Sequence, residues 1–487
     1  MLFFLSILPL ITISIISFLK NEEWIKKFSI FMSFFLFLIS LLLWISFDKC
    51  TSNFQYVFHI QWMNPFNLNF DLGIDGISLF FIILTTFLIP LCMLISYETI
   101  VKNIKEYFIF FFLLEFCLII SFSVLDVMVF YIFFESVLVP MFLIIGIWGS
   151  RERKVKASYL FFIYTLSGSL FMLIAIIHII IHIGTTDYRI LSHYIFDYSY
   201  EKLYFLAFFL AFAVKIPMLP FHIWLPEAHV EAPTSGSVLL AGILLKLGSY
   251  GMIRFLIPLF PQASIYFTPY VILLCLLSII YASLTAIRQT DLKKIIAYAS
   301  IAHMNLIILG IFSMTYQGLE GSILQMISHG LVSSGLFFSI GCLYDRYHTR
   351  FIHYYGGLAS VMPLFCIMLF IYILANMSLP GTSNFVGEIL ILTGIFEENT
   401  TTAIFSIIGM FFGGVYSLLF YNRICYGNIQ TNYLRIYFDL TSRELFIHML
   451  LIINIFILGL YPKMFESCMH ESISQLLVQI EFSYSLK

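Results

Sequence analysis

The chain has 487 residues, of which 61% are hydrophobic and only 11% are charged, and its mean hydropathy is +0.98. Soluble globular proteins carry about 25% charged residues, so the composition excludes that class and predicts a polytopic membrane protein. The net charge is −2, whereas nucleic-acid-binding domains are strongly basic, and no nucleic-acid partner is expected.

Hydropathy predicts an all-α membrane protein of about 14 transmembrane helices, since each crossing needs about 20 apolar residues. The expected spans start near residues 2, 28, 75, 106, 127, 157, 203, 236, 266, 293, 318, 361, 402 and 444. Basic residues gather in the loops that follow odd-numbered spans, which places these loops on the cytoplasmic or matrix side. They include Arg151, Arg153, Lys154, Lys156, Arg288, Lys293, Lys294, Arg423 and Arg435.

Helices 7 and 12 are predicted to be broken. Lys215 lies two residues before Pro217, and Pro380 and Gly381 precede Glu388. Proline removes a backbone donor and disfavours helix at the preceding residue, and broken helices beside buried charges are typical of transporter sites. Five spans separate the two breaks, which predicts two inverted five-helix repeats. The expected divisions are 1–105 (helices 1–3), 106–258 (first repeat, helices 4–8), 259–427 (second repeat, helices 9–13) and 428–487 (helix 14 and tail).

Ionisable side chains near the centres of these spans are the candidate functional groups, because a charge at the bilayer centre costs about 2.5–3.5 kcal/mol and usually marks an ion path. Glu135 lies in FYIFFESVLVPMF and Lys215 in AFAVKIPMLPF. We expect the two to form an element that alternates between a close ion pair and a separated state. Glu115, central in span four, is a secondary candidate that could tune Glu135.

Four further groups continue the series. Lys246 lies in LLAGILLKLGSYG, His303 in YASIAHMNL, His329 in QMISHGLVSSG, and Glu388 follows the second break. Lysine and histidine both suit reversible protonation, whereas arginine stays charged. The sequence therefore predicts a series of proton-transfer groups that crosses from one repeat to the other. The alternative is that these residues are structural salt bridges and satisfied polar groups.

Other features of the sequence provide weaker evidence of function. Arg254, at the end of span eight, is interpreted as an interfacial anchor, and His178 and His182 form an i, i+4 pair without an evident third metal ligand. The eight cysteines contain no CxxC pair, and the sequence has neither a dinucleotide-binding glycine motif nor a P-loop. Redox chemistry and ATP hydrolysis are therefore not expected within this chain.

Several long strings resemble the chain 4 family of mitochondrial NADH:ubiquinone oxidoreductase, respiratory complex I. The resemblance covers nearly the whole chain and is weakest near its two ends. The strings are LGIDGISLFFIILTTFLIP, FFESVLVPMF, VKIPMLPFHIWLPEAHVEAPTSGSVLLAGILLKLGSYG, DLKKIIAYASIAHMN, SHGLVSSGLFF and LANMSLPGTSNFVGE.

The resemblance implies an antiporter-like, proton-translocating subunit of the complex I membrane arm, part of an NADH:ubiquinone reductase. By motif, the family's proton-transfer residues fall on Glu135, Lys215, Lys246, His303, His329 and Glu388. The resemblance also implies that NADH, FMN, iron–sulfur clusters and ubiquinone are bound by other subunits, with no cofactor or metal in this chain. The implied partners are other membrane-arm subunits, including antiporter-like chains 2 and 5, and phospholipids. The implied location is the mitochondrial inner membrane, with the basic loops in the matrix. A cation/proton antiporter subunit and a structural membrane subunit without its own proton path remain as alternatives.

Overall fold

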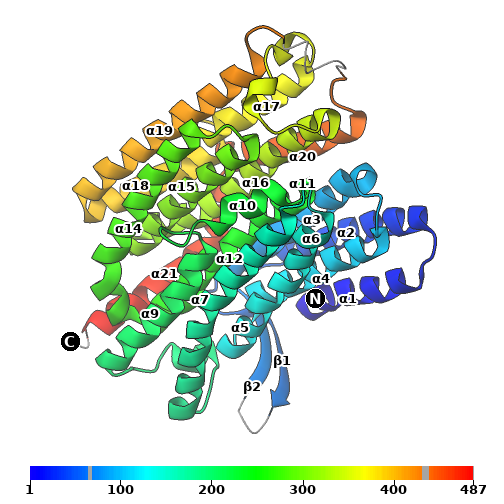
Figure 1. Ribbon diagram of the computed structural model, residues 1–487. Helices are drawn as coiled ribbons and strands as arrows, with labels where there is room; N and C mark the ends of the chain where they lie inside the picture. The colour runs from blue at the N-terminus through cyan, green and yellow to red at the C-terminus, as the bar shows by residue number, and fades with distance from the viewer. Residues whose placement is uncertain (64–67, 430–437, 486–487) are drawn as a thin grey trace.

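The computed structural model describes residues 1–63, 68–429 and 438–485, and Figure 1 shows them as a bundle of long helices lying side by side. Within these residues, 11 helices are long and apolar enough to cross a membrane. The prediction of a multi-pass helical membrane protein is confirmed.

These helices follow one another along the chain with short connections. They are α2 (Glu22–Ile45), α3 (Gly76–Thr99), α4 (Ile104–Ser123), α5 and α6 (Val127–Ser136 and Leu138–Trp148, counted as one), α7 (Lys154–Ile183), the segment Thr234–Leu259, α14 (Pro261–Arg288), α15 (Leu292–Phe312), α16 (Tyr316–Tyr347), α19 (Thr400–Cys425) and α20 (Ser442–Leu460). Two shorter apolar helices are α1 (Leu2–Phe18) and α17 (Pro363–Asn376). The four-residue α8 spans Tyr188–Leu191.

The centre of the bundle is formed by the segment Thr234–Leu259 and by α16. Both are buried inside the chain along their whole apolar length, whereas α7, α14 and α19 leave many large apolar side chains on the outside. In a bilayer such outward apolar faces meet hydrocarbon rather than water. Any polar group on the two central helices is therefore shielded by the rest of the protein.

The helices are interrupted at both positions predicted from proline. α9 (Tyr198–Lys215) ends at its lysine and α10 (Trp224–Glu231) follows it, while α17 is followed by α18 (Ser383–Glu398). The backbone freed by the first break finds side-chain partners, because Trp224 Nε1 donates to the Val214 carbonyl at 2.9 Å. Irregular backbone at membrane depth is tolerated where protein surrounds it in this way.

The segment Thr234–Leu259 is not a uniform α-helix. It alternates α-helical turns with π-helical turns. The α-helical turns are α11 (Thr234–Leu239), α12 (Leu245–Gly251) and α13 (Ile257–Leu259), and the π-helical turns are Leu240–Leu244 and Met252–Leu256. Short π-helical turns are rare and concentrate at functional sites. Lys246 is the second residue after the first of them.

A β-hairpin departs from the all-α prediction. β1 (Gln55–Met63) and β2 (Leu68–Ile74) pair in antiparallel fashion, with Phe58 opposite Leu72, and project from one end of the bundle (Figure 1). The hairpin lies within a polar stretch where a short alternating pattern is a weak signal beside long apolar spans.

The segment after the last span also differs from a simple tail, because it folds as α21 (Lys463–Ser485), which packs against α3 and α16. A Cβ built on Gly76, at the start of α3, would lie 2.0 Å from the Cys468 carbonyl oxygen, so only glycine fits there. The Gly76 N–H also donates to Ser472 Oγ at 3.1 Å. Arg435, counted above among the basic loop residues, lies outside the described residues.

Candidate functional site

Four buried side chains from four helices form a connected series, which we call the polar row: Lys246, His329, His303 and Glu388. Lys246 Nζ lies 2.8 Å from His329 Nδ1, and the rings of His329 and His303 are 5.7 Å apart between centroids. His303 Nδ1 lies 3.1 Å from Glu388 Oε1. The four side chains are between 0 and 8% exposed. The structure therefore brings together four of the six residues predicted to transfer protons.

Local backbone features set the Lys246 end of the row. Lys246 Nζ donates to the carbonyl of Ala241, five residues earlier, as well as contacting His329 Nδ1. The π-helical turn that precedes Lys246 shifts the usual hydrogen-bond pattern of the helix, and Ala241 belongs to it. The ammonium group has three donors, and two of them are used by these contacts.

The Glu388 end of the row depends on a close approach of two helices. Gln325 Nε2 of α16 donates to Glu388 Oε1 of α18 at 3.2 Å. A Cβ built on Gly387 would lie 2.6 Å from Gln325 Oε1 and 2.9 Å from Gln325 Cα. Glycine at this position lets α16 and α18 come close enough for the glutamine to reach the carboxylate.

Glu135 and Lys215 are close but not paired. Lys215 Nζ donates to the Phe134 carbonyl at 3.2 Å and lies 4.0 Å from the centre of the Phe134 ring. Across the described chain, neither Glu135 carboxylate oxygen has a hydrogen-bond partner, and no ion pair within 4.0 Å joins Glu135 to Lys215. This geometry corresponds to the separated state of the predicted two-state element.

The contact between α9 and α12 is made by apolar side chains next to Lys215 in the chain, packed against glycines that follow Lys246. A Cβ on Gly248 would meet the Ile216 side chain at 2.6 Å, and one on Gly251 would meet the Phe212 ring at 2.4 Å. Within the described ranges, no hydrogen bond links Lys215 to Lys246. The six predicted residues therefore fall into two groups, the Glu135–Lys215 pair and the polar row.

Glu115 stands apart from both groups. Its side chain is fully buried in α4, and both carboxylate oxygens lack a hydrogen-bond partner in the part of the chain that the structure describes. Among the described residues, no hydrogen bond joins it to Glu135, so its suggested tuning role stays a prediction.

Two basic residues were placed wrongly by the sequence interpretation. Arg254 is not an interfacial anchor, because it is 5% exposed and its guanidinium pairs with Asp75 at 2.5 Å. Lys293 is not a solvated loop residue, because it is 2% exposed and donates to the Ala232 carbonyl at 2.8 Å. Both lie within a few residues of a predicted span end, where an error of one helical turn decides between water and protein.

Sequence reasoning also missed His229 and Arg350. Both His229 ring nitrogens are buried without a hydrogen-bond partner among the residues that the structure describes, and the ring stacks on Phe337 with 4.5 Å between centroids. Arg350 is fully buried and lies 3.4 Å from Glu231 Oε1. Arg350 follows α16 by three residues, and its sequence gave no sign that this connection would be buried. The histidine pair in α7 is bonded internally, with His182 Nε2 3.1 Å from His178 Nε2.

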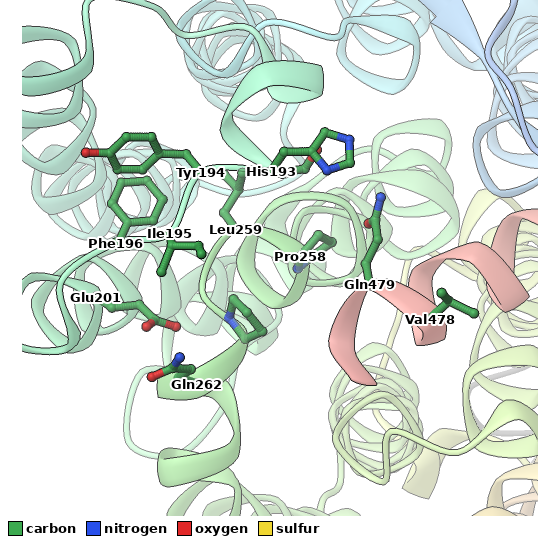
Figure 2. A pocket seen from close by; sticks show the side chains of 12 residues that line it. His193, Tyr194, Ile195, Phe196, Glu201, Pro258, Leu259, Gln262, Val478 and Gln479 are labelled. Carbon is green, nitrogen blue, oxygen red and sulfur yellow. The ribbon is translucent and has the colours of Figure 1, made fainter. Parts of the chain in front are cut away.

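A separate cavity lies away from the polar row. It has a volume of about 330 Å³ and is lined by the connection between α8 and α9, the start of α14 and the end of α21. Figure 2 shows Tyr194, Phe196, Gln262 and Gln479 on its walls together with Glu201. The Glu201 carboxylate accepts a hydrogen bond from the Ala263 N–H at 3.0 Å. None of the six predicted proton-transfer residues lines this cavity.

Comparison with known proteins identifies the family. Residues 123–413 match the family model described as NADH:quinone oxidoreductase/Mrp antiporter, and residues 1–124 match NADH-ubiquinone oxidoreductase chain 4, amino terminus. NADH-ubiquinone oxidoreductase chain 4 of Marchantia polymorpha is 53% identical over 480 residues, which cover 98% of this chain and 97% of the relative. The chain belongs to the NADH-ubiquinone oxidoreductase chain 4 family. The resemblance found in the sequence is confirmed.

Other members of the chain 4 family agree. The chain 4 protein of Arabidopsis thaliana is 53% identical over 476 residues, covering 97% of this chain and 96% of the relative. A chain of the solved structure titled "Respiratory complex I from Thermus thermophilus with bound NADH" superimposes with a TM-score of 0.89 at 27% identity, covering 99% of this chain and all of that chain. Both groups of candidate residues lie inside the region that matches the antiporter model.

Proposed function

We propose that this chain is a proton-translocating membrane-arm subunit of respiratory complex I, which couples electron transfer from NADH to ubiquinone to proton movement across the mitochondrial inner membrane. The observation that carries the proposal is the buried polar row, in which Lys246, His329, His303 and Glu388 succeed one another across the bundle centre. Membership of the chain 4 family indicates which redox enzyme drives the proposed proton movement.

The proposal includes a specific architecture. The 11 apolar spans, the short helix α1 and the two interrupted helices α9–α10 and α17–α18 together account for 14 crossings. We assign helices 4–8 and 9–13 to two inverted repeats within residues 106–258 and 259–427. Supporting this, α7 packs against α9 just as α16 packs against α18, so each interrupted helix lies beside the helix that precedes it.

The proposed mechanism depends on electrostatic repulsion between the Glu135–Lys215 pair and the polar row. When Glu135 pairs closely with Lys215, the lysine charge is compensated and Lys246 keeps its proton. When the pair separates, repulsion between the two ammonium groups favours proton transfer from Lys246 to His329. The proton then passes through His303 to Glu388. Moving one charge through 100 mV requires about 2.3 kcal/mol, which is within the range of such charge–charge interactions.

The proposal assigns the remaining chemistry to other subunits. NADH, FMN, iron–sulfur clusters and ubiquinone bind elsewhere in the complex, and the neighbours of this chain include antiporter-like chains 2 and 5 and phospholipids. The basic loops face the matrix, in keeping with the positive-inside rule.

A cation/proton antiporter subunit is the second candidate, because the matching family model also describes Mrp antiporters. The two functions differ in what drives transport. We expect the purified assembly that contains this chain, in sealed vesicles, to pump protons during rotenone-sensitive NADH oxidation. Sodium–proton exchange without NADH, or NADH oxidation whose pumping is unaffected by Glu388→Gln, would contradict the proposal. Loss of assembly alone in this variant would favour a purely structural subunit.

A further inference from the structure

A small cavity lies beside Glu388 at α19. Its volume is about 30 Å³, and its walls include His303, Asn376, Ser378, Glu388 and Tyr416. This volume exceeds the roughly 10–15 Å³ that a cavity needs in order to hold one water molecule. The cavity therefore joins the end of the polar row to polar groups that the proposed mechanism does not yet use.

Three of the lining residues have a buried polar atom without a hydrogen-bond partner among the described residues. These atoms are Tyr416 Oη, His303 Nε2 and Ser378 Oγ. Tyr416 is 3% exposed and His303 is 8% exposed, so bulk solvent does not reach them freely. Buried polar atoms in folded proteins are nearly always paired with protein or with ordered water, and a buried water needs two to four polar partners. One water in this cavity meets both requirements.

Among the described residues, the Tyr416 hydroxyl makes no hydrogen bond of standard geometry, although Asn376 lies close to it on the wall of the same cavity. The Asn376 amide is already engaged, because its Nδ2 donates to Ser417 Oγ at 2.9 Å. Tyr416 and Glu388 line the same cavity, and the structure shows no hydrogen bond between the Tyr416 hydroxyl and the Glu388 carboxylate. A bridging water can connect two polar groups that make no direct hydrogen bond.

We propose that Tyr416 is a positioning residue of the proton path, whose hydroxyl holds a water molecule against the Glu388 carboxyl group. This inference rests on the proposed function. When Glu388 releases its proton, the carboxyl O–H bond breaks and a new O–H bond forms on the water. The resulting hydronium ion gives a proton to solvent and becomes water again, and Glu388 is reprotonated from His303.

The test compares Tyr416→Phe with Tyr421→Phe in the assembled complex. Tyr421 is a matched control on the same helix, with its hydroxyl 3.5 Å from the Cys366 carbonyl oxygen and outside the cavity. We expect Tyr416→Phe to lower proton-coupled NADH oxidation about fivefold, which is less than the roughly 100-fold loss typical of a group that transfers the proton itself, and Tyr421→Phe to leave it unchanged.

Infrared spectroscopy gives a measurement that should stay unchanged if Tyr416 has only a structural role. The C=O stretching band of protonated Glu388, identified by its loss in Glu388→Gln, should shift in Tyr416→Phe and stay in place in Tyr421→Phe. An unmoved band in Tyr416→Phe, or equal losses of activity in both tyrosine variants, would overturn the inference. If Glu388→Gln itself pumped normally, the proposed function would fail instead.

A second variant keeps the test decisive if Tyr416→Phe does not assemble. A Cβ on Gly413 would lie 3.9 Å from Tyr416 Oη and would clash with nothing. Gly413→Ala therefore keeps the hydroxyl but fills water space, and we expect the same band shift and a similar fall in coupled activity. Normal activity with an unshifted band would overturn the inference.

Discussion

The Glu135–Lys215 pair and the polar row are built differently, although both consist of buried ionisable groups. In the polar row, His303 contacts Glu388 directly and Lys246 contacts His329 directly. Lys215 instead turns to the backbone and ring of Phe134, and no hydrogen bond among the described residues links it to Lys246. In the proposed mechanism the row transfers protons between neighbours, whereas the pair changes the electrostatic field at the start of the row.

This difference assigns separate tasks to the two groups. Transfer along a hydrogen-bonded series needs short distances, but repulsion between charges acts across several ångströms of apolar packing, where screening is weak. Electrostatic control of the row by the pair would therefore require no water-filled connection between the two groups. Substitutions in the two groups should therefore impair coupled NADH oxidation in different ways.

Lys246→Ala should have the largest effect, because it removes the first proton carrier of the row. We expect coupled NADH oxidation to fall about 100-fold, which is typical for the loss of a positioned acid–base group, while the complex still assembles. Lys246→Arg is the informative companion, since arginine keeps the charge but does not release a proton. Proton uptake by sealed vesicles measures both, and normal pumping in Lys246→Arg would show that this residue carries no proton.

Lys215→Ala should have a smaller effect, because it removes the controlling charge but no member of the row. We expect a fall of about tenfold in coupled turnover, equivalent to about 1.4 kcal/mol, with fewer protons moved per NADH. Lys202→Ala on the same helix is the control, since Lys202 lies over the Tyr198 and Tyr266 rings, 3.9 and 4.0 Å from their centres. An unchanged number of protons moved per NADH in Lys215→Ala would contradict the distinction between the two groups.

Gly387→Ala tests the geometry of the Glu388 end. The new methyl would come within 2.6 Å of Gln325 Oε1, so α18 must move away from α16 and the Gln325–Glu388 hydrogen bond must lengthen. Overpacking of this kind costs about 1–3 kcal/mol, and we expect a fewfold loss of coupled activity. The control Gly414→Ala meets only Met377 Cε at 3.6 Å, and thermal unfolding of the complex should separate the two variants.

Glu115→Gln should have the smallest effect. Glu115 contacts neither group, and glutamine keeps its volume, so we expect less than about a twofold change in turnover, within the range of substitutions away from key contacts. The same vesicle assay measures it. A loss as large as that of Lys215→Ala would mean that Glu115 acts on Glu135 through a route that the hydrogen bonds do not show.

Some of this organisation could be predicted from the sequence. Long apolar runs predict spans, and proline beside Lys215 and Glu388 predicts the two breaks, because both signals are local. The contact between His303 and Glu388 depends on how α15, α16 and α18 pack, which one sequence does not display. Arg254 was misplaced because burial near a span end depends on a partner, Asp75, that lies far away in the chain.

The contact between α21 and the start of α3 has a consequence for biogenesis. Gly76 lies against the Cys468 carbonyl, and its N–H donates to Ser472, so the start of α3 receives part of its packing from residues that are synthesised only after α20. The amino-terminal helices therefore keep that surface uncovered until α21 has been made. A nascent chain stopped after α20 should be held by insertion factors or degraded, and synthesis of α21 should coincide with protection of the α3 start from protease.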